Sequence, residues 1–154
     1  MKKDNAVWHS LDNSIKQTLL DVRELLSDKR RWTKYSSASD ENGEMVSILD
    51  SRACKYCLSG AVELVLHRRH NYSPRSCYVE GWSKDLYRST FRAIAQTGFP
   101  LYEVSDIQVQ LPASLTLAEK VVRANDYELT GHKDVMCWID EAIKLQEDKL
   151  MDTP

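Results

Sequence analysis

The chain lacks the long apolar run that a membrane-spanning helix requires. Such a helix needs about 20 consecutive apolar residues, and no segment of the 154-residue sequence approaches that length. The charged residues between Met1 and Asn5 are followed by no apolar stretch, so we expect no signal peptide. The sequence therefore predicts a cytoplasmic protein without membrane contacts.

Cysteines are few, and neither sign of charge dominates. Four cysteines in 154 residues are too sparse for a disulfide scaffold, so we expect reduced thiols. The net charge of −2 creates no global positive field that would attract nucleic acid. The length and the ordinary composition, 42% hydrophobic and 29% charged, predict one globular domain over residues 1–154, with residues 1–9 and 148–154 flexible.

Motifs of the familiar enzyme classes are also missing. The sequence contains no Ser-His-Asp order, phosphate loop, dinucleotide fingerprint or HExxH motif. We therefore expect no catalytic residues and no cofactor, and we favour a binding domain over an enzyme.

Apolar residues that recur at helical spacing predict most of the secondary structure. Helices are expected over residues 10–28, from 50 or 51 to 69, over 83–97, from 114 through 122, and from a cap at 130 or 132 through 145. In the last helix, the expected apolar face extends from Val135 to Leu145. Asn125 to Tyr127 is expected to form the loop before it.

A β-hairpin is expected between the first two helices. Asn42-Gly43 supplies turn residues that tolerate positive φ, with expected strands over 34–38 and 45–49. Alternating apolar residues over 104–111 indicate a further strand. The predicted fold class is mainly α (α+β), with about five helices and a small antiparallel hairpin or three-stranded sheet.

Cys54 and Cys57 form a Cys-x-x-Cys pair near the expected start of the second helix, where a helix dipole stabilises a thiolate. The pair does not follow a strand of a βαβ unit, and Cys57 falls on an aliphatic stripe. We favour a buried structural Cys57, with redox or nucleophilic chemistry as the alternative. His67 and His70 complete a zinc-finger-like spacing, but on one helix Cys57 and His67 would lie about 15 Å apart. We expect no metal site.

Two basic segments with aromatic neighbours have the composition of phosphate-binding sites. They contain Arg30, Arg31 and Trp32 in the first and Arg68 and Arg69 in the second. The simpler alternative is a solvated surface with Trp32 inserted into the core. Residues 134–152 contain six acidic and two basic side chains, and such segregation of charge suits a protein partner with complementary patches.

Asn125-Asp126 is followed closely by His132. The pair has three interpretations: it caps the next helix, turns the chain, or places a carboxylate beside the histidine. We favour helix capping.

The segment from Leu25-Leu26 to Trp32, then Gly43, then Ala53 with Cys57-Leu58-Ser59-Gly60-Ala61, resembles the domain family of unknown function DUF6197. Asn125-Asp126 and the helix from Val135 to Ile143 are similar to the closing part of that family, so the resemblance covers about Leu11 to Leu145. Members occur in bacterial and phage-type genomes, and the resemblance implies no activity, cofactor or catalytic residue. Tyr56 and Ala124 depart from the family pattern, and the segment 67–82 is longer than usual.

Three functional hypotheses follow from these observations. The first is a non-enzymatic protein-binding or accessory protein, of the kind that phages and mobile elements encode as inhibitors or regulators. The second is a small ligand-binding domain or enzyme using Cys57, Asn125, Asp126 and His132. The third is nucleic-acid binding through a basic patch, with Arg30, Arg31, Arg68 and Arg69 on one face. We favour the first, because charge is segregated and reactive motifs are missing.

Overall fold

The computed structural model describes residues 3–71, 82–97 and 117–152. Within these ranges it contains, in chain order, α1 (Lys3–Leu26), the short 3-10 helix η1 (Lys29–Arg31), β1 (Ala38–Ser39), β2 (Lys55–Tyr56), α2 (Leu58–His70), α3 (Trp82–Thr97), α5 (Leu117–Asp126) and α6 (His132–Met151). The two strands form one small sheet, so the predicted mainly α fold with a minor β element is confirmed. No helix in the described ranges combines the length and apolarity needed to cross a membrane.

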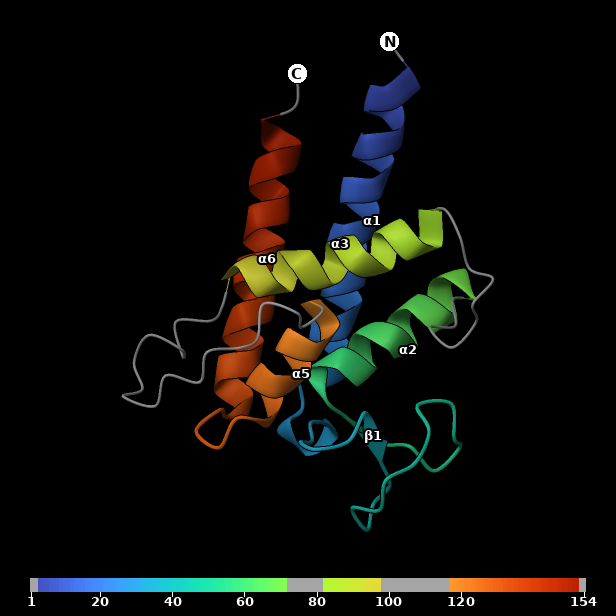
Figure 1. Cartoon of the computed structure of the whole chain (residues 1–154), viewed down its shortest axis with the longest axis vertical. Coiled ribbons are helices and arrows are strands. Elements are labelled where there is room, and N and C mark those ends of the chain that lie inside the picture. Colours follow the sequence, from blue (N-terminus) through green and yellow to red (C-terminus); the bar gives the residue numbers. More distant parts are fainter. Residues whose placement is uncertain (1–2, 72–81, 98–116, 153–154) are drawn as a thin grey trace.

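The longest helices, α1 and α6, lie side by side and bring both ends of the chain to the same end of the molecule (Figure 1). Their facing sides are apolar and include the buried residues Leu19, Val22, Trp138 and Ile139. The exposed ion pairs Arg23–Asp140 (2.5 Å) and Lys16–Glu147 (3.3 Å) join the two helices. Because such exposed pairs contribute at most about 1 kcal/mol each, burial of the apolar faces is the main stabilising contribution.

Two details of this helix pair differ from the prediction. α1 begins at Lys3 rather than Ser10, because no glycine or proline interrupts the preceding residues and a serine caps a helix only where the backbone leaves it. Leu145, predicted to face inward, is 38% exposed, whereas Gln146 is 1% exposed. At roughly 100° per residue, position 146 lies near the centre of the apolar stripe and position 145 at its edge.

The predicted hairpin is confirmed at its tip and at the start of its second arm, where Met45 forms an antiparallel bridge with Ser39 and the Val46 N–H donates to the Ala38 carbonyl at 3.1 Å. Gly43 has φ +82°, and its N–H donates to the Asp40 carbonyl at 3.1 Å, so the turn at Asn42-Gly43 is confirmed. β1, however, pairs with β2 in antiparallel register, Ala38 with Tyr56. Tyr56 is buried, whereas Met45 and Leu49 are exposed. The regular ladder of β1 is therefore formed with the later segment that carries the buried Tyr56, and the hairpin arm adds only an isolated bridge.

α2 begins at Leu58, not near residue 50 as predicted. Asp50 closes only a local turn, accepting a hydrogen bond from the Arg52 N–H at 2.8 Å. Cys57 is the N-cap of α2, and Cys54 lies in the extended segment before it. The two thiols therefore do not share one helix. The predicted burial of Cys57 and of the stripe that follows it is confirmed.

A close backbone approach sets the start of α2. An ideal Cβ built on Gly60 would lie 2.0 Å from the Ser37 carbonyl oxygen. That carbonyl also accepts a hydrogen bond from the Cys57 N–H at 3.2 Å. The strand segment thus packs directly on the first turn of α2, in a position that only glycine allows.

α3 spans the predicted range within one residue and stops at Thr97 as expected. Thr90 is fully buried instead of lying at the border, and its hydroxyl donates to the Leu86 carbonyl at 2.7 Å. The last helix is capped by Gly131, between the two residues that were predicted. The strand expected over 104–111 and the helix start expected at Ser114 lie outside the described residues.

Candidate functional site

The polar centre of the molecule is the side chain of Asn125, which is wholly buried in the last turn of α5. Its Oδ1 accepts hydrogen bonds from Trp32 Nε1 at 2.8 Å and from the Leu58 N–H at 3.1 Å. Its Nδ2 donates to the Thr33 carbonyl at 3.1 Å and to Asp126 Oδ1 at 2.9 Å. Because an amide side chain has two donors and two acceptor lone pairs, the hydrogen-bonding capacity of Asn125 is fully used.

This arrangement corrects the interpretation of Asn125-Asp126. Both residues lie within α5 rather than in the following loop, and Asn125 does not cap α6. Instead it supplies an acceptor to Leu58, whose N–H at the first position of α2 has no partner within that helix. The Cys57 Sγ accepts a hydrogen bond from the Gly60 N–H at 3.3 Å in the same turn. The start of α2 is therefore capped both by Cys57, the residue before the helix, and by Asn125 of α5.

Asp126 and Lys34 hold the segment after η1 against the end of α5. Asp126 Oδ1 accepts a hydrogen bond from the Tyr35 N–H at 2.8 Å. Lys34 Nζ donates to the Tyr127 carbonyl at 2.7 Å and lies 5.6 Å from the centre of the Trp32 ring. Tyr35 has φ +67°, and its side chain is 71% exposed. An aromatic side chain is thus presented to solvent from a backbone conformation that is unfavourable for it.

His132 is near this network but is not paired with the Asp126 carboxylate in the part of the chain that the structure describes. Its Nε2 lies 2.6 Å from the Leu26 carbonyl oxygen, and its ring centroid is 6.1 Å from that of Trp32. The residues proposed for an enzyme site therefore lie around one region, yet their polar atoms bind the backbone and each other.

Cys57 has the environment of a structural thiol. Burial raises its pKa to about 11, although the Gly60 N–H favours the thiolate. The negative charge of Asp126 acts in the same direction as burial. Cys54 is less buried, as predicted, and its Sγ lies 3.8 Å from the Ser39 carbonyl oxygen. At neutral pH Cys57 is protonated, which is unfavourable for nucleophilic chemistry.

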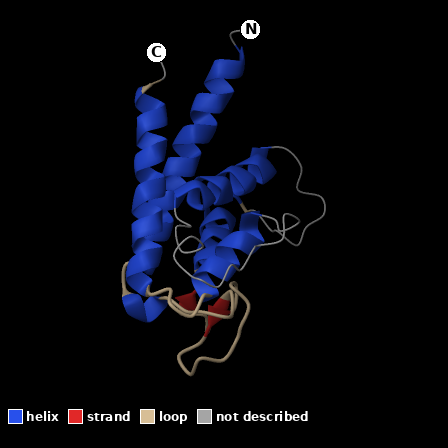
Figure 2. Ribbon diagram, turned by 60° about the vertical axis from the view of Figure 1, so that its left-hand side comes forward, coloured by secondary structure: helices blue, strands red, loops and turns tan. Residues whose placement is uncertain are grey.

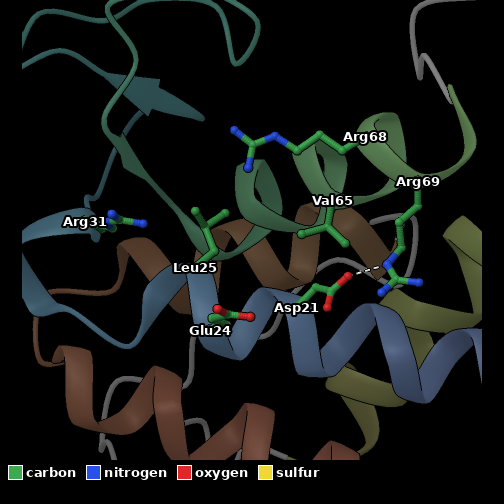
Figure 3. A pocket seen from close by; sticks show the side chains of 7 residues that line it. All are labelled: Asp21, Glu24, Leu25, Arg31, Val65, Arg68 and Arg69. Atoms are coloured by element: carbon green, nitrogen blue, oxygen red, sulfur yellow. Dashed lines mark hydrogen bonds and ion pairs between the residues drawn. The ribbon is translucent and has the colours of Figure 1, made fainter.

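The predicted basic residues are brought together only in part. Arg31, Arg68 and Arg69 line one pocket between η1, α1 and α2, with Asp21, Glu24, Leu25 and Val65 (Figure 3). Arg30 does not line it and instead pairs with Asp28 at 2.7 Å. The hydrogen bonds from Arg30 lower the pKa of the Asp28 carboxyl to about 2. Trp32, predicted to insert into the core, is partly buried against it and donates to Asn125.

The described ranges contain no cluster of side chains that matches a metal centre. Among residues 3–71, 82–97 and 117–152, no group of three His, Cys, Asp or Glu side chains is arranged to hold an ion. Cys57 and His67 lie at opposite ends of α2.

The architecture defines a mainly helical domain whose loop-rich end is held by a buried asparagine. The chain belongs to the family described as "Family of unknown function (DUF6197)", which matches residues 10–145. This confirms the family expected from the sequence motifs, while the expected bacterial or phage origin stays a prediction. Comparison with curated proteins and with solved structures gives no match.

Proposed function

We propose that this domain is a non-enzymatic protein-binding protein and that Tyr35 is an anchor for its partner. The observation that carries the proposal is the combination of 71% exposure and φ +67° at this residue. A positive φ costs a non-glycine residue of order 1–3 kcal/mol. The hydrogen bonds of Asp126 and Lys34 compensate for this cost and fix the backbone from which the ring projects, which lowers the entropy lost on binding.

Other exposed apolar side chains lie at the same end of the molecule. Leu129 is 73% exposed and immediately follows Glu128, whose carbonyl lies 3.4 Å from Lys34 Nζ. Met45 and Leu49, 75% and 57% exposed, come from the loop between β1 and β2. Figures 1 and 2 show both loops at the end opposite the chain termini. Aromatic and apolar anchors surrounded by polar groups are typical of protein interfaces.

The internal use of the candidate catalytic residues also favours binding over catalysis. Asn125 uses its full hydrogen-bonding capacity inside the fold, and the Cys57 thiol caps α2. A cytoplasmic accessory protein of a bacterium or phage, acting as an inhibitor or regulator, is the setting that we infer for such a domain.

The test separates loss of the anchor from loss of the fold. Tyr35→Gly removes the ring and relieves the positive φ, so the free energy of unfolding should stay equal or rise by about 1 kcal/mol. Binding should change in the opposite direction. We expect a partner captured from host-cell extract by the wild-type chain to be lost with Tyr35→Gly, as measured by quantitative mass spectrometry.

Met151→Ala is the matched control, because Met151 is 84% exposed and ends α6 at the opposite end of the molecule (Figure 1). It should capture the same protein as the wild-type chain. Equal capture by the Tyr35→Gly variant would contradict the proposed role of this surface.

A further inference from the structure

The pocket between η1, α1 and α2 is lined by both cationic and apolar side chains. Its volume is about 290 Å³, and Leu25 and Val65 lie between the charged side chains. Figure 3 shows Arg68 extending from α2 toward the side of the pocket where Arg31 lies, while Arg69 turns to Asp21 on α1. The space suits one or two side chains, since sites for drug-sized ligands start at about 300 Å³.

Two of the three guanidinium groups that line the pocket have no ion pair within the part of the chain that the structure describes. Arg69 is paired with Asp21, whereas Arg31 and Arg68 form no salt bridge with any residue in the described ranges. Burial raises the pKa of Tyr56, and the charges of Arg68 and Arg31 both oppose that effect. Both guanidinium groups therefore act on the same phenol, which agrees with their position around one pocket.

The charge balance of the pocket selects among anions. The lining side chains that the structure describes are three arginines, Asp21 and Glu24, which leaves a net of one positive charge. A nucleic acid would bring several phosphates toward Glu24, with repulsion from its carboxylate. A single carboxylate matches the net charge and can accept paired N–H groups from an arginine.

We propose that this pocket binds one Asp or Glu side chain from an acidic segment of the protein partner. The neighbouring apolar side chain of that segment packs on Leu25 and Val65. The inference rests on the proposed protein-binding function, and it adds a second contact with a defined chemistry to the Tyr35 surface.

The experiment is an NMR titration of the full chain with N-acetyl-Glu-Leu-amide. Saturable shifts are expected at the Arg31 and Arg68 side-chain Nε–H signals and at the Leu25 and Val65 methyl groups. The matched ligand N-acetyl-Gln-Leu-amide, which lacks the charge, should bind about tenfold more weakly or not at all. Arg31→Gln and Arg68→Gln should each weaken binding of the charged peptide about tenfold.

Arg30→Gln is the control variant, because it removes the same charge from the same segment outside the pocket. It should leave the titration nearly unchanged. Equal binding of the Gln peptide, equal weakening by Arg30→Gln, or no shift at these groups overturns the proposal. Tighter binding of inorganic phosphate or of a random duplex at the same signals also overturns it and reassigns the pocket to phosphate.

The two proposals fail separately. The peptide titration does not involve Tyr35, so the Tyr35→Gly variant should give the wild-type titration. A pocket without peptide binding, in a chain whose partner capture still depends on Tyr35, rejects the pocket alone. Peptide binding by a chain whose partner capture is insensitive to Tyr35 rejects the Tyr35 surface alone.

Discussion

Two regions of this molecule are stabilised in different ways. Along the α1–α6 pair, the helices bury apolar faces against each other and are joined by exposed ion pairs. At the loop-rich end, short segments from residues 32–35, 57–60 and 124–132 are joined by hydrogen bonds around Asn125. Many small apolar contacts share the stability of the helix pair, whereas one amide side chain determines much of the stability of the loop-rich end. The comparison predicts unequal sensitivity to single substitutions.

The largest effect is expected for Asn125→Ala. The change leaves the Trp32 Nε1–H, the Leu58 N–H and the Thr33 carbonyl without their partner. Because each unsatisfied buried group costs about 1–3 kcal/mol, the free energy of unfolding should fall by about 4 kcal/mol. Chemical denaturation measures it.

The matched change in the α1–α6 pair is Arg23→Gln, which removes the exposed ion pair with Asp140. Its expected cost is within about 0.5 kcal/mol. Similar losses in the free energy of unfolding for Asn125→Ala and Arg23→Gln would show that the asparagine network stabilises the fold no more than an exposed ion pair does.

The second effect tests the backbone approach at the start of α2. A Cβ on residue 60 would clash with the Ser37 carbonyl oxygen at 2.0 Å, so Gly60→Ala must displace either the strand segment or the helix. We expect a loss of about 3 kcal/mol in thermal or chemical unfolding. Gly43→Ala is the comparison, because no heavy atom lies within 4 Å of its added Cβ and only its φ of +82° opposes the change. It should cost about 1 kcal/mol; a larger loss at Gly43 than at Gly60 would reverse the argument.

The smallest effect concerns Cys57. Cys57→Ala should cost about 1 kcal/mol at neutral pH, through lost packing and the lost hydrogen bond from Gly60. The pKa of this thiol rises from 9.0 to about 11 on folding. A raised pKa means that the unfolded chain releases the proton first, so stability is retained below about pH 9 and falls as the pH approaches 11.

Denaturation between pH 8 and about pH 11 should show this decline in the wild-type chain beyond the decline in Cys57→Ala. The variant corrects for the other groups that titrate in that range. Cys57 should also react slowly with iodoacetamide at neutral pH, and rapid alkylation in the folded protein would restore the nucleophile hypothesis.

The sequence predicted the helices better than it predicted the loop-rich end. Helical periodicity located α3 and the apolar faces of α1 and α6 because those faces repeat within each segment. It misplaced the start of α2 and missed β2, because both depend on contacts that no local pattern contains. Asn125 was singled out, but its role was assigned to the wrong helix, since its partners lie 67 and 93 positions away.

Within the candidate surfaces, sequence analysis identified part of each set of residues. Charge and aromatic composition drew attention to Arg31, Arg68 and Trp32. Nothing in the sequence indicates that Tyr35 adopts a positive φ, because tyrosine rarely does so. The Asp126 carboxylate that supports this conformation belongs to a helix far away in the sequence. The neutralisation of Arg69 by Asp21 on α1 was missed for the same reason.

The long separation between Trp32 and Asn125 also has a consequence for the order of folding. Closing a contact across 93 positions carries an entropy cost that must be met before the contact stabilises the chain. During synthesis, the Trp32 and Leu58 donors emerge long before the asparagine that receives them. We therefore expect the loop-rich end around Asn125 to fold late. Asn125→Ala should then accelerate unfolding far more than it slows folding.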